Sequence, residues 1–296
     1  MASSSSGYQV PLLARFVGLG AIVVVAVAAC GPDRASDAGA DTGGSDQKAG
    51  STSSSIVVQR VIDGDSLELV VDGGEIDVRL LGINAPELRT LSDQRSCPGD
   101  AARGHLESLL EGAGSLVFRA GEEDRFGRRL GVIDADGHPV TESMVTDGWA
   151  LALWSADDER LTASMLAAAE ADRGWWGAEC GPPASATLAI SDHQANAPGD
   201  DRENLAEEWV EVVNTGPEPV DLDGWTIRDE TTSNQFRISG LTLHPGRSVR
   251  FRSGSGPTTA DDYYLGEQFP VWSNGGDTAL LVDPAGIVAA YAFLTG

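Results

Sequence analysis

A run of alternating apolar and polar residues constrains this chain's fold more than any other feature. In residues 60–87, RVIDGDSLELVVDGGEIDVRLLGINAPE, Leu67 and Leu69 alternate with polar residues, and the alternation resumes after the turn Asp72-Gly73-Gly74. Period-2 alternation on both sides of a glycine-containing turn predicts a β-hairpin with one buried face. The segment therefore predicts the opening strands of a β-rich domain.

Two carboxylates in this segment indicate a site. Asp63 and Asp65 share the parity of Leu67 and Leu69, so we expect both to face the domain interior or its mouth. A charge in such a place is costly without a partner. Arg79 or a cation would provide one. The alternative is two ordinary polar turn residues around a glycine.

Three segments together resemble the staphylococcal nuclease (thermonuclease) family. They are Asp63-Gly64-Asp65-Ser66, residues 79–87 (RLLGINAPE) and residues 124–128 (DRFGR), in the order that the family has them. The resemblance covers residues 56–182. It implies an OB-fold β-barrel with three helices (an α+β domain) and a calcium-dependent phosphodiesterase site.

The resemblance also implies a ligand set for Ca²⁺, a cation that takes oxygen ligands in loose geometry. Asp65 would bind the ion directly, Ala85 through its backbone carbonyl, and Asp63 through water. Asn84 stands where the family commonly has aspartate, so its amide oxygen would coordinate without adding charge.

Three further residues match the family's catalytic positions. Glu87 would orient or deprotonate the attacking water, and Arg79 and Arg128 would bind the phosphate oxygens. Salt bridges to neighbouring acids are the alternative for both arginines. Trp154 lies near a position where the family stacks a nucleotide base, which makes it a candidate for substrate binding.

The remaining pattern of residues 56–182 predicts strands at 115–120 and 129–134 and a helix over 101–110. Thr141 is expected to cap a short second helix. Ser155 and Asp158 are expected to form a capping box for a third helix, which Gly174 would end.

Residues 184–296 contain many short β-like runs and close turn signals, without a convincing amphipathic helix. The segments 209–214, 219–225, 243–246 and 271–277 together resemble the lamin-tail domain, an immunoglobulin-like β-sandwich. The fold class expected for the whole chain is thus β-rich and two-domain. Trp209 and Trp225 are expected in the sandwich core, with ligand stacking as the alternative.

The N-terminus has the pattern of a targeting segment. An apolar run over residues 16–29 is short for a transmembrane helix and ends in Val27-Ala28-Ala29-Cys30-Gly31, which resembles a bacterial lipobox. This implies a signal peptide at 1–29, a lipid on Cys30, and a flexible linker over residues 30–55. An ordinary signal peptide with an incidental cysteine is the alternative.

Either form of processing predicts an extracytoplasmic protein, and the lipobox predicts a lipid anchor at the cell surface. With Cys30 consumed, Cys97 and Cys180 remain in an oxidising compartment. An even number of cysteines in such a space predicts a disulfide between them.

The formal net charge of −25 disfavours a high-affinity, salt-sensitive nucleic-acid binder, which needs a basic face. A hydrolase that must release its product can tolerate this charge. The leading hypothesis is therefore a lipid-anchored, monomeric, calcium-dependent nuclease that cleaves DNA, and RNA as a further substrate, leaving 3′-phosphate ends.

In this hypothesis the lamin-tail-like domain docks the protein to an envelope partner, which rests on analogy alone. Two rivals stay open. One is a catalytically weak module that only binds nucleic acid, and the other is a structural surface lipoprotein in which the barrel is incidental.

Overall fold

The computed structural model describes residues 56–156, 158–200 and 202–294, which belong to one compact unit. The signal peptide, the lipidated Cys30 and the linker over residues 30–55 lie outside the described residues, so these remain predictions. None of the described helices is both long and apolar enough to cross a membrane.

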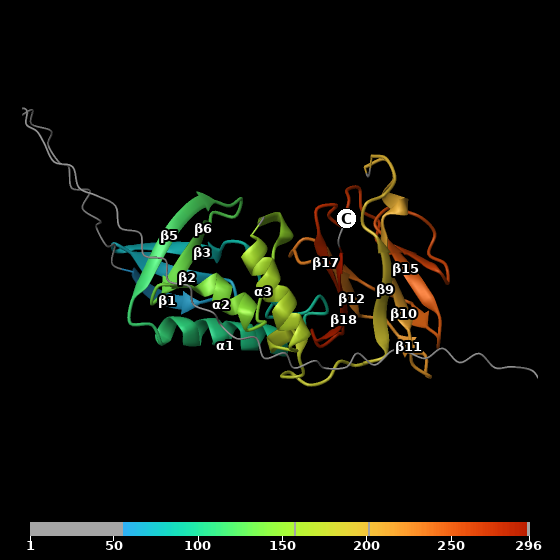
Figure 1. The fold of residues 1–296 in the computed structure, drawn as a ribbon, viewed down its shortest axis with the longest axis horizontal. Coiled ribbons are helices and arrows are strands. Elements are labelled where there is room, and N and C mark those ends of the chain that lie inside the picture. Colours follow the sequence, from blue (N-terminus) through green and yellow to red (C-terminus); the bar gives the residue numbers. More distant parts are fainter. Residues whose placement is uncertain (1–55, 157, 201, 295–296) are drawn as a thin grey trace, which may run out of the picture. The chain divides into compact units, whose positions relative to one another are not determined.

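The N-terminal domain is built on a mostly antiparallel sheet (Figure 1). Its strands follow the order β1 (Ile56–Val61), β2 (Ser66–Val71), β3 (Gly74–Leu80), β6 (Arg129–Ala135) and β5 (Leu116–Glu123), with β7 (His138–Pro139) beside β6. A second small sheet pairs β4 (Ile83–Asn84) with β8 (Leu151–Ala152).

The predicted hairpin is confirmed, because β2 and β3 pair around a turn in which Asp72 and Gly73 both have positive φ (50° and 85°). Positive φ at both central residues is typical of the type I′ turns that suit twisted strands. The predicted OB-like arrangement of five strands is present, but it is not a closed barrel: among the described strands, β1 and β5 at the two ends of the path do not pair.

Three α-helices accompany these strands, as predicted. They are α1 (Cys97–Glu111), α2 (Val140–Thr146) and α3 (Glu159–Glu170), with short 3-10 turns at η1 (Trp154–Ala156) and η2 (Gly174–Trp176).

Three expectations about helix ends were wrong. The residue before α2 is Pro139, not Thr141, and it makes no side-chain cap. Asp158 caps α3 alone, by accepting from the N–H groups of Arg160 and Leu161, while Ser155 lies in η1. Gly174 does not end α3, which stops at Glu170; it begins η2 instead.

The C-terminal domain consists of two four-stranded sheets and a small pair, the arrangement expected for an immunoglobulin-like sandwich. One sheet has the order β16 (Asp262–Tyr264), β15 (Ser248–Arg252), β10 (Trp209–Asn214) and β9 (Leu188–Gln194). The other has the order β13 (Gln235–Arg237), β12 (Thr226–Arg228), β17 (Asp277–Val282) and β18 (Val288–Leu294); β11 (Val220–Asp221) pairs with β14 (Thr242–Leu243).

The two predicted core tryptophans of this domain differ. Trp225 is buried in the core, as expected. Trp209 is only half-buried and lies under the guanidinium of Arg250, 4.6 Å from its ring centroid. Because Trp209 alternates along β10 with the buried Val210 and Val212, it lies on the outer face of the sheet and does not fill the core.

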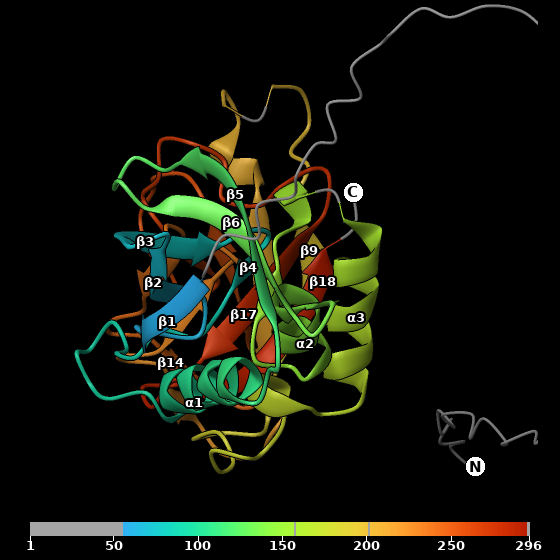
Figure 2. The same ribbon diagram turned by 90° about the vertical axis from the view of Figure 1, so that its left-hand side faces the viewer.

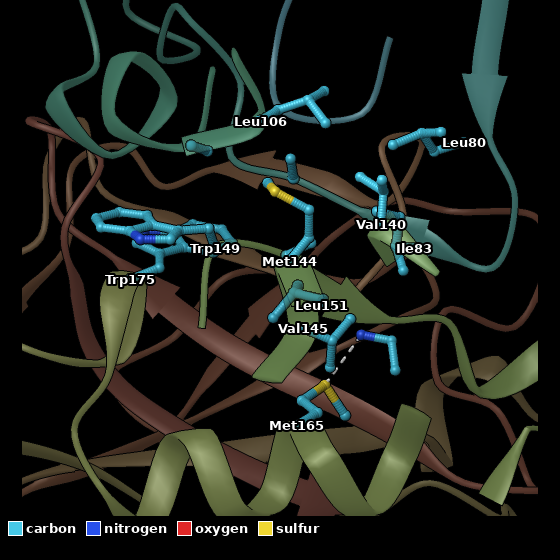
Figure 3. Packing of buried hydrophobic residues seen from close by; sticks show 14 of the residues in the cluster. Leu80, Ile83, Leu106, Val140, Met144, Val145, Trp149, Leu151, Met165 and Trp175 are labelled. Carbon is cyan, nitrogen blue, oxygen red and sulfur yellow. Dashed lines mark hydrogen bonds between the residues drawn. The ribbon is translucent and has the colours of Figure 1, made fainter. Parts of the chain in front are cut away.

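The two domains share part of one hydrophobic core. Figure 3 shows the nuclease-domain side of this cluster, around Met144, Leu151 and Trp175. Leu280 and Val282 of β17 belong to the same buried cluster as Met144 and Trp149 of the N-terminal domain. At the junction, the indole nitrogen of Trp175 donates to the carbonyl of Gly286 at 2.9 Å. In Figures 1 and 2, α3 lies beside β18, and Tyr291 of β18 donates to the carbonyl of Ala169 at 3.4 Å.

The predicted disulfide is present. Cys97 and Cys180 are bonded, with their Cα atoms 5.8 Å apart. The bond joins the first residue of α1 to the segment that follows η2, so it closes the N-terminal domain on itself.

Candidate active site

Strand register brings the three motif segments together. In the β2–β3 pair Ser66 lies opposite Arg79, which sets the Asp63–Asp65 turn beside that arginine. In the parallel β3–β6 pair Arg79 lies opposite Leu130. The turn that carries Arg128 immediately precedes β6, so this turn lies close to Arg79. The positions that are far apart in the sequence therefore meet at one end of the sheet.

Asp65 and Arg79 form the buried centre of this end of the sheet. Asp65 is 5% exposed, and its Oδ1 lies 3.1 Å from Nε of Arg79, while its Oδ2 accepts from the backbone N–H of Ala85 at 2.6 Å. Burial raises the pKa of Asp65 to about 7, and the nearby Arg79 opposes that rise. The predicted cationic partner of this carboxylate is thus Arg79.

Glu87 is half-buried and follows β4, where its backbone packs directly against the first turn of α1. Burial and the charge of Asp63 raise the pKa of Glu87, and the positive charges of Arg228, Arg79 and Arg128 act in the opposite direction. A carboxylate with a raised pKa is better suited to accept a proton than one exposed to solvent.

Arg128 is fixed by Asp124, which lies at the start of its own turn. Its Nε and Nη2 lie 2.9 and 2.8 Å from Oδ2 of Asp124, and its Nη1 donates to Ser66 Oγ at 3.4 Å. Arg128 thus forms the local salt bridge that was the alternative to a phosphate contact. It can still bind phosphate, because its side chain is 32% exposed.

These side chains line a cleft of about 490 Å³. It is bordered by carboxylates, guanidinium groups, an aromatic ring and hydroxyls: Asp63, Asp65, Ser66, Arg79, Glu87, Arg125, Phe126, Arg128, Thr232 and Ser233. Eight of these residues come from the three predicted motif segments, and the last two come from the C-terminal domain.

Sequence reasoning missed the roles of several cleft residues. Phe126 is 68% exposed, with the guanidinium carbons of Arg125 and Arg128 at 4.7 and 5.5 Å from its ring centroid. Exposed aromatic rings are the side chains on which nucleotide bases stack in proteins that bind single strands. The position of Phe126 inside the 124–128 motif was the one sequence feature that could have indicated its place at the cleft. Nothing in the sequence pointed to Thr232 or Ser233.

Trp154 does not line this cleft. Its indole N–H donates to Thr278 Oγ1 of β17 at 2.9 Å, and its ring packs against Gly276. The structure thus gives Trp154 a contact with the C-terminal domain and does not bring it to the other predicted site residues.

The predicted calcium ligands all provide oxygen donors, the type that a hard cation prefers, but not all of these oxygens are free to bind an ion. Asp63 and Asp65 offer carboxylate oxygens to the cleft, as Ca²⁺ prefers. The Oδ1 atom of Asn84 already accepts from Arg79 Nη2 at 3.0 Å and from Thr232 Oγ1 at 2.9 Å. Within the part of the chain that the structure describes, no three His, Cys, Asp or Glu side chains gather as a metal site.

A cleft that pairs guanidinium groups with carboxylates is suited to bind and hydrolyse a phosphodiester, and the comparisons with known proteins assign the chain to a class with that activity. The profile of the staphylococcal nuclease homologues matches residues 77–177, and that of the Lamin Tail Domain matches residues 181–294. The chain belongs to the staphylococcal nuclease homologues and carries a lamin-tail domain after the nuclease domain. It is a nuclease, an enzyme that hydrolyses phosphodiester bonds.

Curated relatives agree with this assignment. The chain is similar to Endonuclease YncB of Bacillus subtilis (strain 168), with 27% identity over 153 residues, 44% of this chain and 72% of that protein. It is similar to an Uncharacterized endonuclease of Escherichia coli O157:H7, with 31% identity over 122 residues, 40% of this chain and 74% of that protein. With SPbeta prophage-derived endonuclease YokF of Bacillus subtilis (strain 168), identity is 30% over 97 residues, 32% of this chain and 33% of that protein.

Proposed function

We propose that this nuclease is a calcium-dependent phosphodiesterase that cleaves DNA, and RNA as a further substrate, in the cleft bordered by Arg79, Glu87 and Arg128. The observation that carries the proposal is the convergence of these three side chains with Asp63 and Asp65 on one cleft. Two guanidinium groups and a carboxylate with a raised pKa are the groups that an in-line attack of water on phosphorus needs.

Each side chain has a distinct part in this chemistry. Arg128 and Arg79 bind the phosphate oxygens and neutralise the negative charge that develops during attack. Glu87 orients the water and accepts its proton. Phe126, exposed beside Arg128, offers a face on which a neighbouring base stacks. The cleft thus holds a strand by its backbone and by one base.

Calcium would be held by Asp65 with Asp63 and the Ala85 carbonyl, and when bound it would add positive charge beside the phosphate. The support for this ion is the family to which the chain belongs and the oxygen donors at the cleft. Because Asp65 lies 3.1 Å from Arg79, this ion pair and the cation compete for the same carboxylate.

We also propose that the nuclease acts outside the cytoplasm and is tethered by a lipid on Cys30. The support is the lipobox-like sequence at residues 27–31 and the disulfide between Cys97 and Cys180, a bond typical of oxidising compartments. Metabolic labelling with a radioactive fatty acid tests the anchor: label should enter the wild type and not Cys30→Ser.

Two substitutions test the catalytic assignment. Glu87→Gln removes the proton acceptor and Arg128→Ala removes a phosphate donor, so each should lower kcat on single-stranded DNA by about 10²–10⁴-fold. The matched control is Arg129→Ala, whose side chain is 41% exposed and pairs with Glu123 outside the cleft lining. Cleavage that survives both cleft substitutions would reject this site.

A further inference from the structure

The loop between β12 and β13 of the lamin-tail domain reaches into the nuclease domain at Asn84. The side-chain N–H of Asn84 donates to the carbonyl of Glu230 at 2.8 Å, and its Oδ1 accepts from Thr232 Oγ1 at 2.9 Å. Asn84 is 2% exposed. Both ends of its amide therefore pair with one loop of the other domain.

Asn84 also links the lamin-tail loop to Arg79 through a hydrogen bond. Its Oδ1 also accepts from Arg79 Nη2 at 3.0 Å, while Arg79 Nη1 donates to the carbonyls of Leu80 and Ile83 at 2.8 Å. With Nε beside Asp65, each nitrogen of the guanidinium has a fixed position. Among the described residues, Asn84 holds the Nη2 edge of the guanidinium, and the lamin-tail loop in turn holds Asn84.

The loop itself is built to hold its shape. Asp229 accepts from the backbone N–H and the hydroxyl of Thr231 at 2.6 and 2.7 Å, and from the side chain of Asn234 at 2.6 Å. Arg228, 3% exposed, donates to the carbonyls of Asp229 and Thr231, both at 2.9 Å. A loop braced by buried charged groups can position what it touches.

The loop also forms part of the cleft. Thr232 and Ser233 border it together with Asp65, Arg79 and Glu87. Contacts made by the neighbouring strand β17 hold the loop in this position. Thr278 of β17 accepts a hydrogen bond from the indole N–H of Trp154, and Leu280 and Val282 of β17 pack in the core of the nuclease domain. The nuclease domain alone would lack one wall of its cleft.

We propose that the lamin-tail loop completes the nuclease active site, with Asn84 as a positioning residue that couples Thr232 to Arg79 and does not serve as a metal ligand. This rests on the proposed function. A nuclease domain that separates from its lamin-tail domain is then a poor catalyst, so any partner that pulls the lamin-tail domain away lowers cleavage.

The test uses the full chain and a conservative pair at one position. Thr232→Val keeps the shape of the side chain and removes the hydroxyl, whereas Thr232→Ser keeps the hydroxyl. We expect Thr232→Val to lower kcat on a fluorescent single-stranded oligonucleotide about tenfold with little change in KM, and Thr232→Ser to restore it. The matched control is Thr215→Val, which removes an exposed hydroxyl that bonds within the lamin-tail domain.

Amide hydrogen exchange provides a readout that does not depend on activity. Thr232→Val should speed exchange in residues 79–87 without changing the melting temperature, because Thr232 is exposed on its own domain. Unchanged exchange and unchanged kcat in Thr232→Val, with an active wild type, would overturn the inference alone. An inactive wild type would reject the proposed function, and exchange would still report on the coupling.

Asn84→Asp separates a coupling role from a ligand role. As a ligand, aspartate would tighten Ca²⁺ binding in calorimetry and raise cleavage at low calcium. As the coupling residue, it loses the donor to Glu230 and sets a carboxylate against that carbonyl. The inference therefore predicts cleavage at least tenfold lower with no gain in Ca²⁺ affinity; tighter Ca²⁺ binding with retained cleavage would contradict it.

Discussion

Single residues in this chain bear charges that the fold buries, and their surroundings decide what each can do. Glu87 and Asp65 are held at the cleft with raised pKa values and facing cations. Asp277 of β17 is different, because it lies 1% exposed among other acids of the lamin-tail domain. Glu87 and Asp65 are therefore placed to act on a substrate in the cleft, whereas Asp277 affects the stability of the fold.

Asp277 should make stability depend on pH. Burial, a hydrogen bond with Glu230 and the charge of that residue raise its pKa from 3.8 to about 10. The folded chain thus keeps a proton that the unfolded chain releases above about pH 4. Unfolding releases this proton, so the contribution of Asp277 to the free energy of unfolding falls as pH rises from about 4 to about 10.

Asp277→Asn tests this account. The amide mimics the protonated acid, so the variant should stay folded and lose much of the decline in unfolding free energy between pH 5 and pH 9 (about the range that denaturant titrations cover). The matched control is Asp261→Asn, an exposed carboxylate paired with Arg247. A variant whose stability declines with pH as steeply as the wild type would show that Asp277 is not the group responsible.

At the scale of elements, the first turn of α1 positions Glu87. A Cβ atom on Gly99 would lie 2.2 Å from the carbonyl oxygen of Glu87 and 2.6 Å from its carbonyl carbon. Gly99→Ala should therefore push Glu87 out of place and lower kcat by about 10²-fold, since small displacements in a site cost that much.

Gly104→Ala in the same helix is the matched control, because a Cβ there meets nothing within 4 Å. It should leave kcat unchanged and stabilise the helix by about 0.5–1 kcal/mol. Equal kcat in the two variants would mean that the contact between α1 and Glu87 does not matter for cleavage.

The elements also show what the sequence can predict. Alternation and turn chemistry predicted β2, β3 and their turn, because a local pattern determines them. The helix caps were misread at Thr141 and Ser155, where several nearby residues can fill one role and packing selects among them. Closure of the barrel depends on pairing between β1 and β5, which local pattern does not encode.

The site could be predicted only within the nuclease domain. Arg79, Glu87 and Arg128 were found because each stands in a recognisable motif, and the structure brings them to one cleft. Thr232 lies 148 residues from Asn84, in a loop with no motif of its own, so only the fold reveals their contact.

For the whole molecule, the two domains act as one structure with a common core and a common cleft. Its net charge of −25 opposes tight, lasting attachment to nucleic acid. Local guanidinium groups at the cleft oppose that repulsion where the phosphate must bind. A molecule of this kind is suited to cleave and release, which agrees with the enzyme class of its family.

The most direct measurement is hydrolysis of single-stranded DNA by the purified full chain, with calcium and then with excess chelator. We expect cleavage that rises with calcium up to the millimolar range, as for weak extracellular sites, and that stops when calcium is removed. Cleavage that continues unchanged in chelator would contradict the calcium dependence. Absence of cleavage at every calcium concentration would contradict the central claim that this cleft hydrolyses phosphodiester bonds.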